Sequence, residues 1–295
     1  MKIKPFWAIM LTIVLIWVGN YMYAEQHKLD HPVFLNHYLD ISLENELYIP
    51  FYFITNKDDT SYIQLVELGN IRGTPDRFGE NEGVEEVEQF GRYSLKRVNI
   101  QFDPEASVKP GETVRFNEMV VHFTGHDTKI YPIGQILFQR QKEELDPFAF
   151  KSGSVGEYSE ARLAAREALT IESVSTVFDD TLQGKFHIKL QSADHAETEQ
   201  LETVLESDEW SKTKGTDIRK MKFPLHLKMG DWLTVKSYAD PSLHALLDVK
   251  IDLNGTTEAG ELFVGQVGHL HFYPYMTKES IQRVIDERTE VENHE

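Results

Sequence analysis

The chain has no cysteine among its 295 residues. This absence excludes a disulfide framework, a cysteine-ligated metal site, a thiol nucleophile and a cysteine-linked lipid. A chain without such links has to fold around an ordinary hydrophobic core. With 41% hydrophobic and 26% charged residues it has the composition of folded material, and its length suggests about two domains.

Motifs of catalysis are also missing. There is no G-x-S-x-G nucleophile elbow, since the nearest stretch, SGSVG at 152–156, has the wrong spacing. The sequence has neither the H-E-x-x-H pair of a metalloprotease nor a glycine-rich phosphate loop. We therefore predict no catalytic residue and no cofactor, and we expect a protein that is not an enzyme.

Basic residues are scarce relative to acidic ones. The chain carries 30 Lys and Arg against 48 Asp and Glu, for a formal net charge of −18. A field of this sign repels nucleic acid and anionic lipid headgroups. Nucleic acid is thus not an expected partner. Solubility accounts for most of the acidic surface, and a cationic partner is the sharper alternative.

One long apolar run stands at the start of the sequence. Residues 6–18 are apolar except for Thr12, and Lys2 and Lys4 precede them. A membrane span needs about 20 apolar residues, and residues 6–24 just reach that length. The run therefore predicts a transmembrane anchor that contacts the membrane through residues 6–24.

A cleavable signal peptide is the alternative for residues 1–24. It needs an apolar core of roughly 7–15 residues followed by a small-x-small site. Ala24 can end such a site, but Met22 is bulky for the position two residues earlier. Both alternatives place residues 25–295 outside the cytoplasm, because the positive charges precede the apolar run. An exported protein without cysteine is typical of Gram-positive bacteria, and this favours such a source.

The remaining sequence is rich in short segments of strand character separated by turn residues. In YSLKRVNIQF (93–102), for example, alternation places Val98, Ile100 and Phe102 on one face. Many short strands at this spacing predict a mainly β fold. We expect two tandem immunoglobulin-like β-sandwich domains, the first over 25–145 and the second over 170–276, with short peripheral helices.

The segment 146–169 is predicted to be a linker followed by a short helix. Residues 142–156 mix charge, proline, glycine and serine, which is typical of a linker. The stretch EYSEARLAAREAL (157–169) consists largely of strong helix formers.

Residues 277–295 are predicted to form a C-terminal helix and tail. Thr277 is a suitable N-cap, and Ile281, Val284 and Ile285 recur at helical spacing. We expect this helix to pack on the second domain or to fray.

A short motif occurs in both halves. VKPGETVRF (108–116) and LKMGDWLTV (227–235) share the order apolar, Lys, any residue, Gly, acid, strand, and IGQILF (133–138) and VGQVGHLHF (264–272) follow them. The pattern resembles the turn that precedes a strand in immunoglobulin-like extracellular β-sandwiches, which implies architecture rather than activity. Two explanations remain open, an ancient duplication and the common composition of β-turns.

Two groups of residues are candidates for metal binding. His269 and His271 alternate on a predicted strand, so both point to one face at a separation that suits metal ligation, although the sequence identifies no third ligand. Asn56, Asp58 and Glu67 stand at positions that an EF-hand loop would use for calcium. Both groups have plainer explanations, surface histidines for the first and hairpin-turn residues for the second, and the histidines can also confer pH sensitivity.

The expected function is a non-catalytic one outside the cytoplasm. The protein is predicted to bind, scaffold or assist a membrane protein or another component of the cell envelope, where tethering raises its effective concentration. The first alternative is an ion or small-molecule sensor domain. The second is an envelope hydrolase without a recognisable motif.

Overall fold

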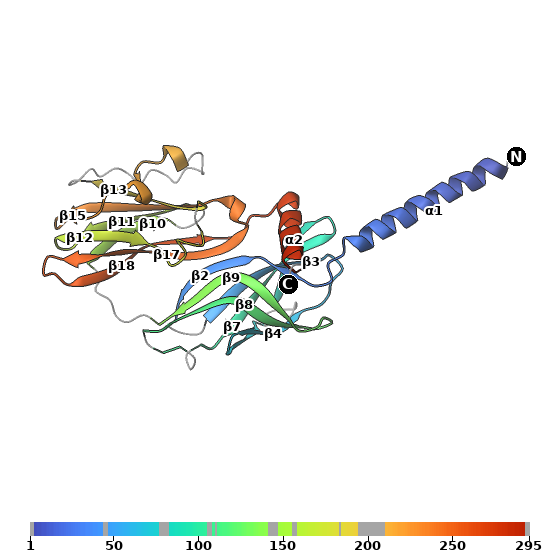
Figure 1. Ribbon diagram of the computed structural model, residues 1–295, viewed down its shortest axis with the longest axis horizontal. Helices are drawn as coiled ribbons and strands as arrows, with labels where there is room; N and C mark the ends of the chain where they lie inside the picture. The colour runs from blue at the N-terminus through green and yellow to red at the C-terminus, as the bar shows by residue number, and fades with distance from the viewer. Residues whose placement is uncertain are drawn as a thin grey trace.

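The fold is described from a computed structural model of the chain (Figure 1). The structure describes residues 3–43, 47–76, 83–104, 108–109, 111–140, 147–154, 158–182, 184–193 and 210–292. Within these residues the fold is mainly β, with one α-helix near each end of the chain.

Strands dominate both halves. The first half contains α1 (Ile3–Gln26), β1 (Val33–Phe34), β2 (Asn36–Ser42), β3 (Leu47–Asn56), β4 (Ile63–Leu68), β5 (Ile71–Pro75), β6 (Val84–Phe90), β7 (Tyr93–Phe102), β8 (Thr113–Phe123) and β9 (Lys129–Gln139). The second half contains β10 (Phe148–Ser154), β11 (Tyr158–Ala165), β12 (Leu169–Ser175), β13 (Phe186–Ala193), β14 (Thr216–Asp217), β15 (Leu225–Leu227), β16 (Trp232–Ala239), β17 (Ala245–Thr257), β18 (Leu262–Phe272) and α2 (Lys278–Glu292).

Alternation of apolar residues forms these strands as expected. In β7 the side chains of Val98, Ile100 and Phe102 are at most 1% exposed, and they lie on one face of the strand. Burial of such alternate residues is what selects strand over helix in these segments. The prediction of a mainly β fold is confirmed.

The strands form two sheets, and the larger one runs through both halves of the chain. Its order is β1-β3-β7-β5-β4-β8-β9-β2-β17-β12-β15, with β18 paired to β17 and β6 to β7. The second sheet has the order β10-β11-β16-β13-β14. Strand β2 makes the link, because it pairs in parallel with β9 on one side and with β17 on the other. The sequence did not predict this continuity between the two expected sandwiches, and the boundaries drawn between them stay a prediction.

Two hydrophobic cores lie along the large sheet. The first consists mainly of apolar residues of β1 to β9 together with those of α2, and the second mainly of residues of β10 to β18 together with Leu137 of β9. Two neighbouring residues of β17 belong to different cores: Leu246 to the first and Leu247 to the second. β17 therefore has one face toward each core at this point, and it is the strand where the halves meet.

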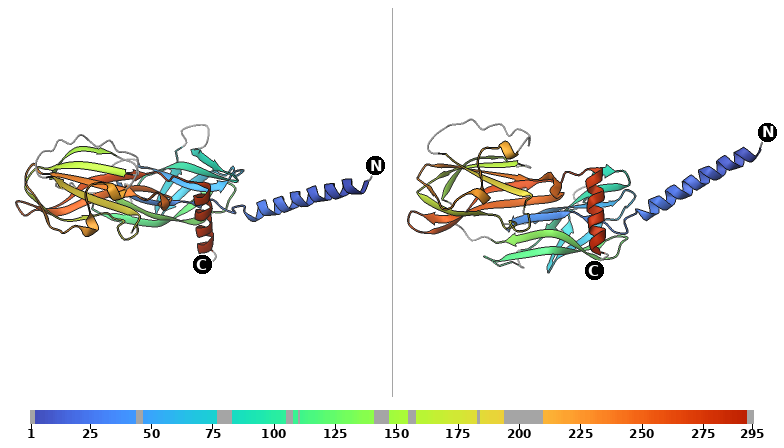
Figure 2. Two further views of the ribbon diagram at one scale, coloured as in Figure 1. Left: turned by 90° about the horizontal axis from the view of Figure 1, so that it is seen from above. Right: turned by 45° about the horizontal axis from the view of Figure 1, so that its top comes forward.

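Helix α1 covers the apolar run at the start of the sequence. It projects away from the strands in every view (Figures 1 and 2), and its described side chains, such as Leu15 and Trp17, are exposed. Across the described residues, no helix combines the length and the apolar character that crossing a bilayer requires. A helix over this segment is thus confirmed, whereas the predicted transmembrane anchor is not.

Helix α2 begins after the predicted cap. Thr277 Oγ1 accepts a hydrogen bond from the backbone N–H of Ser280 at 3.2 Å, as an N-cap does. Ile281, Val284 and Ile285 are buried, but they belong to the first core rather than the second. Figure 2 shows α2 against the strands of the first half. The C-terminal helix is confirmed, and its expected packing on the second domain is wrong.

The helix predicted over 157–169 does not form. Residues 158–165 are strand β11, which pairs with β10 on one side and β16 on the other. Ala161, Leu163 and Ala165 alternate into the core, whereas Glu160 pairs with Arg162 at 2.9 Å. Pairing on both edges outweighs the helical preference of Ala, Leu, Glu and Arg, since intrinsic propensity amounts to less than about 1 kcal/mol per residue. Most of the predicted linker, 148–154, is likewise strand.

The two Lys-x-Gly-acid motifs form the same turn. In each, the acid donates its N–H to the lysine carbonyl at 3.0 Å, and its carboxylate accepts from the lysine N–H, at 3.0 Å for Glu112 and 2.7 Å for Asp231. Gly111 and Gly230 have φ of 78° and 86°, a region that favours glycine.

The strands beside these two turns are connected differently. The first turn hydrogen-bonds to Arg140, which follows the next strand in sequence, whereas the second bonds to Ala165 of the earlier strand β11. The segment 133–138 pairs with the strand after its turn, but 264–272 pairs with β17 instead. The motif thus recurs as a local turn, while the topology around it does not repeat.

Candidate functional site

Polar side chains gather on one face of the hairpin formed by β17 and β18, which lie side by side in Figure 1. Asp248 is the register partner of His271, and Lys250 is the partner of His269. Successive side chains of a strand point to opposite faces, so these four share one face. The intervening Val249 faces the second core and is fully buried.

A β-bulge in β18 sets this arrangement. Ile251 pairs with Gly268 whereas Asp252 pairs with Gln266, so Val267 has no register partner. An extra residue on one strand shifts everything beyond it to the other face. Without this bulge the two histidines would point into the second hydrophobic core, which makes the bulge a requirement of the site.

Asp248, His269 and His271 bring three potential metal ligands together. One ligand atom from each residue lies within 4.8 Å of the others, and they form the one such group of three or more His, Asp or Glu in the described residues. His269 Nε2 is hydrogen-bonded to Asp248 Oδ1, and His271 Nδ1 lies 3.5 Å from Asp248 Oδ2. The side chains are 42%, 25% and 28% exposed for His269, His271 and Asp248, so an ion can reach them from solvent.

The carboxylate of this cluster is held in its charged form. Burial alone would raise the pKa of Asp248, but the hydrogen bonds from His269 and His271 outweigh it and lower the pKa to about 2. In turn, the hydrogen bond to Asp248 raises the pKa of His269. Asp248 therefore offers an ionised oxygen ligand at neutral pH.

A second polar layer links the cluster to the first half. Lys250 donates a hydrogen bond to Ser42 Oγ and lies 3.8 Å from the carboxylate of Asp40, both on β2. Gln139 of β9 donates to the same carboxylate. The candidate site thus borders the seam where β17 meets β2.

One nitrogen of the cluster has no partner. His271 Nε2 is buried and makes no hydrogen bond within the described residues. The ring of Tyr273 packs against this imidazole with 4.6 Å between centroids, and Tyr273 in turn approaches Tyr52 of β3 at 6.4 Å. A buried imidazole nitrogen without a partner is destabilising. Because Nδ1 is the atom that faces Asp248, an ion in the cluster would bind His271 through Nδ1 and not through Nε2.

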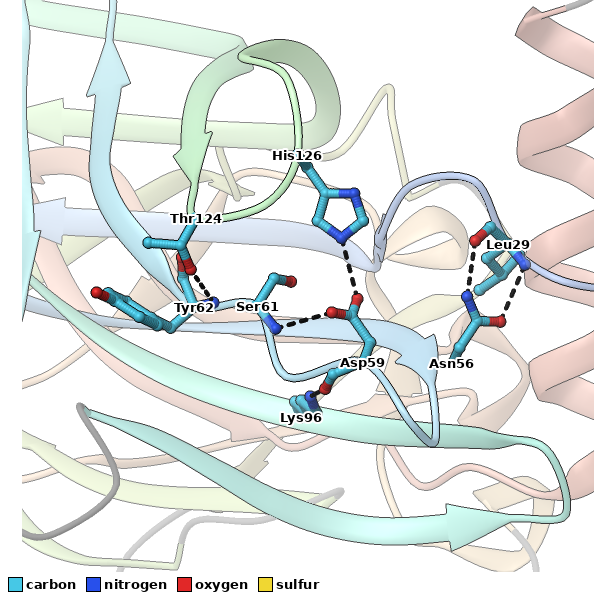
Figure 3. A network of polar contacts seen from close by, with 8 residues as sticks. All are labelled: Leu29, Asn56, Asp59, Ser61, Tyr62, Lys96, Thr124 and His126. Atoms are coloured by element: carbon cyan, nitrogen blue, oxygen red, sulfur yellow. Dashed lines mark hydrogen bonds and ion pairs between the residues drawn. The ribbon is translucent and has the colours of Figure 1, made fainter.

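The calcium candidates do not form a comparable group. Both amide atoms of Asn56 bond the backbone of Leu29, at 3.0 and 2.7 Å, and hold the connector after α1 (Figure 3). Glu67 lies in β4 and pairs with Arg72 at 2.9 Å. Asp58 is exposed in the turn between β3 and β4 and joins no group of three ligands in the described part of the chain. The structure therefore assigns Asn56 a structural role and keeps Glu67 engaged elsewhere.

Asp59 rather than Asp58 organises that turn. Its carboxylate accepts from Ser61 N–H at 2.8 Å and contacts His126 Nε2 at 3.2 Å, while its backbone carbonyl accepts from Lys96 (Figure 3). Burial opposes ionisation of Asp59, yet the bonds from Ser61 and His126 hold its pKa below the ordinary value. These contacts hold the loop between β3 and β4 against the turn between β8 and β9, which contains His126.

The sequence identified two of the three clustered residues. Alternation placed His269 and His271 on one face, and the structure brings them together there. Asp248 was missed, because its approach depends on the pairing of two strands and on a bulge between them. The alternation of Asp248, Lys250 and Asp252 in the sequence was a signal that this strand has one polar face.

Comparisons with known proteins identify no family. No family model matches the chain, and no curated protein matches it.

Solved structures give distant matches. The collagen-binding domain of the Erysipelothrix rhusiopathiae surface protein RspB is 9% identical over 82% of this chain and 92% of its own, with a TM-score of 0.24. The collagen adhesin of S. aureus is 9% identical over 78% and 89%, with a TM-score of 0.23. The C-terminal domain of the Streptococcus pyogenes antigen I/II-family protein AspA is 9% identical over 81% and 98%, with a TM-score of 0.18. Similarity this low carries no argument about the function of this chain.

Proposed function

We propose that this protein is a non-catalytic binding protein of the cell envelope that takes up a divalent transition-metal ion through Asp248, His269 and His271. The observation that carries the proposal is the convergence of these three ligand atoms within 4.8 Å of one another. This function corresponds to the first alternative from the sequence, an ion or small-molecule sensor domain, with an ion as the ligand.

The donor set indicates which ions fit. Two imidazole nitrogens and one carboxylate oxygen suit Zn²⁺ and its neighbours, whereas Ca²⁺ and Mg²⁺ prefer oxygen ligands alone. Three protein ligands leave a coordination position for water or for a group from a binding partner. Lys250 next to the cluster repels a cation, but its nearness to Asp40 at 3.8 Å offsets much of that charge.

Binding rather than catalysis is proposed because the chain carries no motif of a catalytic apparatus around this cluster. Location outside the cytoplasm is proposed from the basic residues that precede the apolar run. The exposed apolar side chains of α1, Leu15 and Trp17 among them, favour association with a membrane. Limited proteolysis of intact cells checks the location, and a protein that stays protected until the cells are lysed would show that it is wrong.

The metal site is tested on the full chain, purified in detergent and freed of metal with a chelator. Addition of Zn²⁺ at 100 times the dissociation constant should stabilise the fold by about 2.7 kcal/mol, seen as a higher melting temperature. Co²⁺ in place of Zn²⁺ should give absorption bands typical of nitrogen and oxygen ligation. The absence of both signals would exclude the site.

Matched variants separate the cluster from histidines in general. His269→Ala and Asp248→Asn should abolish the stabilisation and the cobalt bands. His226→Ala is the control, because His226 also lies on a strand and also has one polar contact, to Thr170 Oγ1 at 3.1 Å, yet lies outside the cluster. Equal losses in all three variants would mean that binding is not located at Asp248, His269 and His271.

A further inference from the structure

A second candidate site is a cavity against helix α2. This cavity of about 350 Å³ separates α2 from two loops of the second half and from the start of β2. One loop precedes β13, and the other is the short 3₁₀-helix Pro241–Leu243 before β17. Cavities of this size hold small ligands.

The cavity is lined by positive charge. Lys185 comes from the loop before β13, and Arg283 and Arg288 come from α2, while Glu287 is the single carboxylate in the lining. Such a concentration of cations is unexpected in a chain whose net charge is −18. Like charges placed together repel one another, and an anion between them relieves the repulsion.

Two of these cations form no ion pair within the described residues, although the charge of Lys185 acts on nearby Asp240. No described carboxylate lies within ion-pair distance of Lys185 or Arg283, and the Lys185 ammonium reaches the backbone carbonyl of Ser242 at 3.5 Å. Arg288 differs, because it donates a hydrogen bond to the side chain of Asn36. The first two side chains are therefore the ones available to an incoming anion.

A histidine in the same lining adds a separate observation. His244 caps the 3₁₀-helix in a left-handed conformation with φ 46°, and its Nδ1 is buried without a hydrogen-bond partner among the described residues. Burial, then the nearby charges of Arg283 and Lys185, lowers the pKa of His244, against the opposing charge of Glu287. The negative charge of an anion in the cavity would oppose that effect and favour the protonated, cationic ring.

We propose that this cavity binds a phosphate-type oxyanion between Lys185, Arg283 and His244. Phosphate suits the site better than a carboxylate does, because it offers acceptor oxygens in several directions and these donors come from three separate elements. The ligand would also tie α2, which packs on the first core, to loops of the second half. This inference does not depend on the metal site, which uses other residues.

Calorimetric titration of the full chain tests the site, with the chelator present so that metal-bound phosphate does not contribute. At constant ionic strength, inorganic phosphate and glycerol phosphate are the two probes, and acetate is the monovalent comparison. Phosphate should bind at least tenfold more tightly than acetate. Tighter binding of glycerol phosphate than of inorganic phosphate would identify a phosphate monoester as the ligand, and the reverse would identify the free ion.

Exposed side chains allow substitutions that leave the fold intact. Lys185→Ala with Arg283→Ala should weaken phosphate binding at least tenfold, whereas Lys57→Ala, an exposed lysine outside the cavity, should leave it unchanged. Glu287→Gln should tighten binding severalfold, a gain that a damaged fold cannot produce. The proposal is overturned if phosphate gives no saturable heat, if Lys57→Ala weakens binding as much as the double variant does, or if Glu287→Gln does not tighten it.

Discussion

Lys250 of β17 and Asp40 of β2 form an ion pair across the seam between the two halves, with 3.8 Å between Nζ and Oδ1 and side chains that are 10% and 1% exposed. Burial raises the pKa of Asp40, and the Lys250 charge and the Gln139 hydrogen bond oppose that shift. Burial outweighs both, so the pKa of Asp40 stays above its ordinary value in a place where water is scarce. Because Lys250 is the register partner of His269, the pair also borders the candidate metal ligands.

Loss of one partner should therefore be more harmful than loss of both. Lys250→Met leaves Asp40 buried without its cation and should lower the free energy of unfolding by about 3 kcal/mol. The double variant Lys250→Met with Asp40→Asn buries no charge and should regain most of that loss. Urea unfolding of metal-free protein measures both. A double variant that is less stable than Lys250→Met would contradict this account.

A buried histidine should make the fold sensitive to acid. His37 is fully buried, its Nε2 accepts the Tyr52 N–H at 3.2 Å, and burial lowers its pKa from 6.5 to about 3. Above pH 6.5 the folded and unfolded states are both neutral at this residue. Between pH 6.5 and about 3 only the unfolded state takes up the proton, so stability should fall by up to about 1.4 kcal/mol for each pH unit of acidification.

Comparison with His37→Gln isolates this effect from the other histidines. Glutamine keeps an acceptor for the Tyr52 N–H but does not titrate, so the variant should lose less stability than the native chain between pH 6 and pH 4. Chemical unfolding at several pH values gives the two slopes. Parallel slopes would show that His37 is not the source of the acid sensitivity.

The approach of β2 to β9 depends on a glycine. Gly134 has φ +81°, and a Cβ there would lie 2.8 Å from the His37 carbonyl oxygen and 3.0 Å from its nitrogen. Gly134→Ala should therefore disturb the parallel pairing that carries the sheet toward the second half. Gly125 also has φ +81° but has no atom within 4 Å of the Cβ position, so Gly125→Ala measures the backbone strain alone.

Strain in the left-handed region amounts to roughly 1–2 kcal/mol. Thermal unfolding should show Gly125→Ala losing about that much and Gly134→Ala losing at least twice as much, because backbone atoms cannot move aside as a flexible side chain can. Equal losses would mean that β2 shifts freely, and the continuity of the large sheet would then not depend on this contact.

Sequence alone was sufficient where the controlling interactions are local. Alternation in β7 and the Thr277 cap of α2 act within a few residues, and both were predicted. The strand β11 was predicted as a helix because its own residues give no sign that it pairs with β10 and β16. Asp248 was missed for the same reason. Its position opposite His271 follows from strand pairing and from the bulge at Val267. Neither feature can be predicted from the residues of one strand alone.

The recurring Lys-x-Gly-acid turn leads to a last prediction, about why the acid is present. In both copies the carboxylate accepts the N–H of the lysine three residues earlier, but Asp231 is 7% exposed whereas Glu112 is exposed. A donor that loses its acceptor in a buried place costs about 1–3 kcal/mol, and one that water can reach costs much less. Asp231→Ala should therefore destabilise the fold by about 1–3 kcal/mol and Glu112→Ala by about 0.5 kcal/mol.

Asp231→Asn keeps an acceptor oxygen and should recover most of the loss in a denaturant titration. If it recovered nothing, the charge of Asp231 rather than its hydrogen bond would stabilise the turn, and the shared motif would need an electrostatic explanation instead.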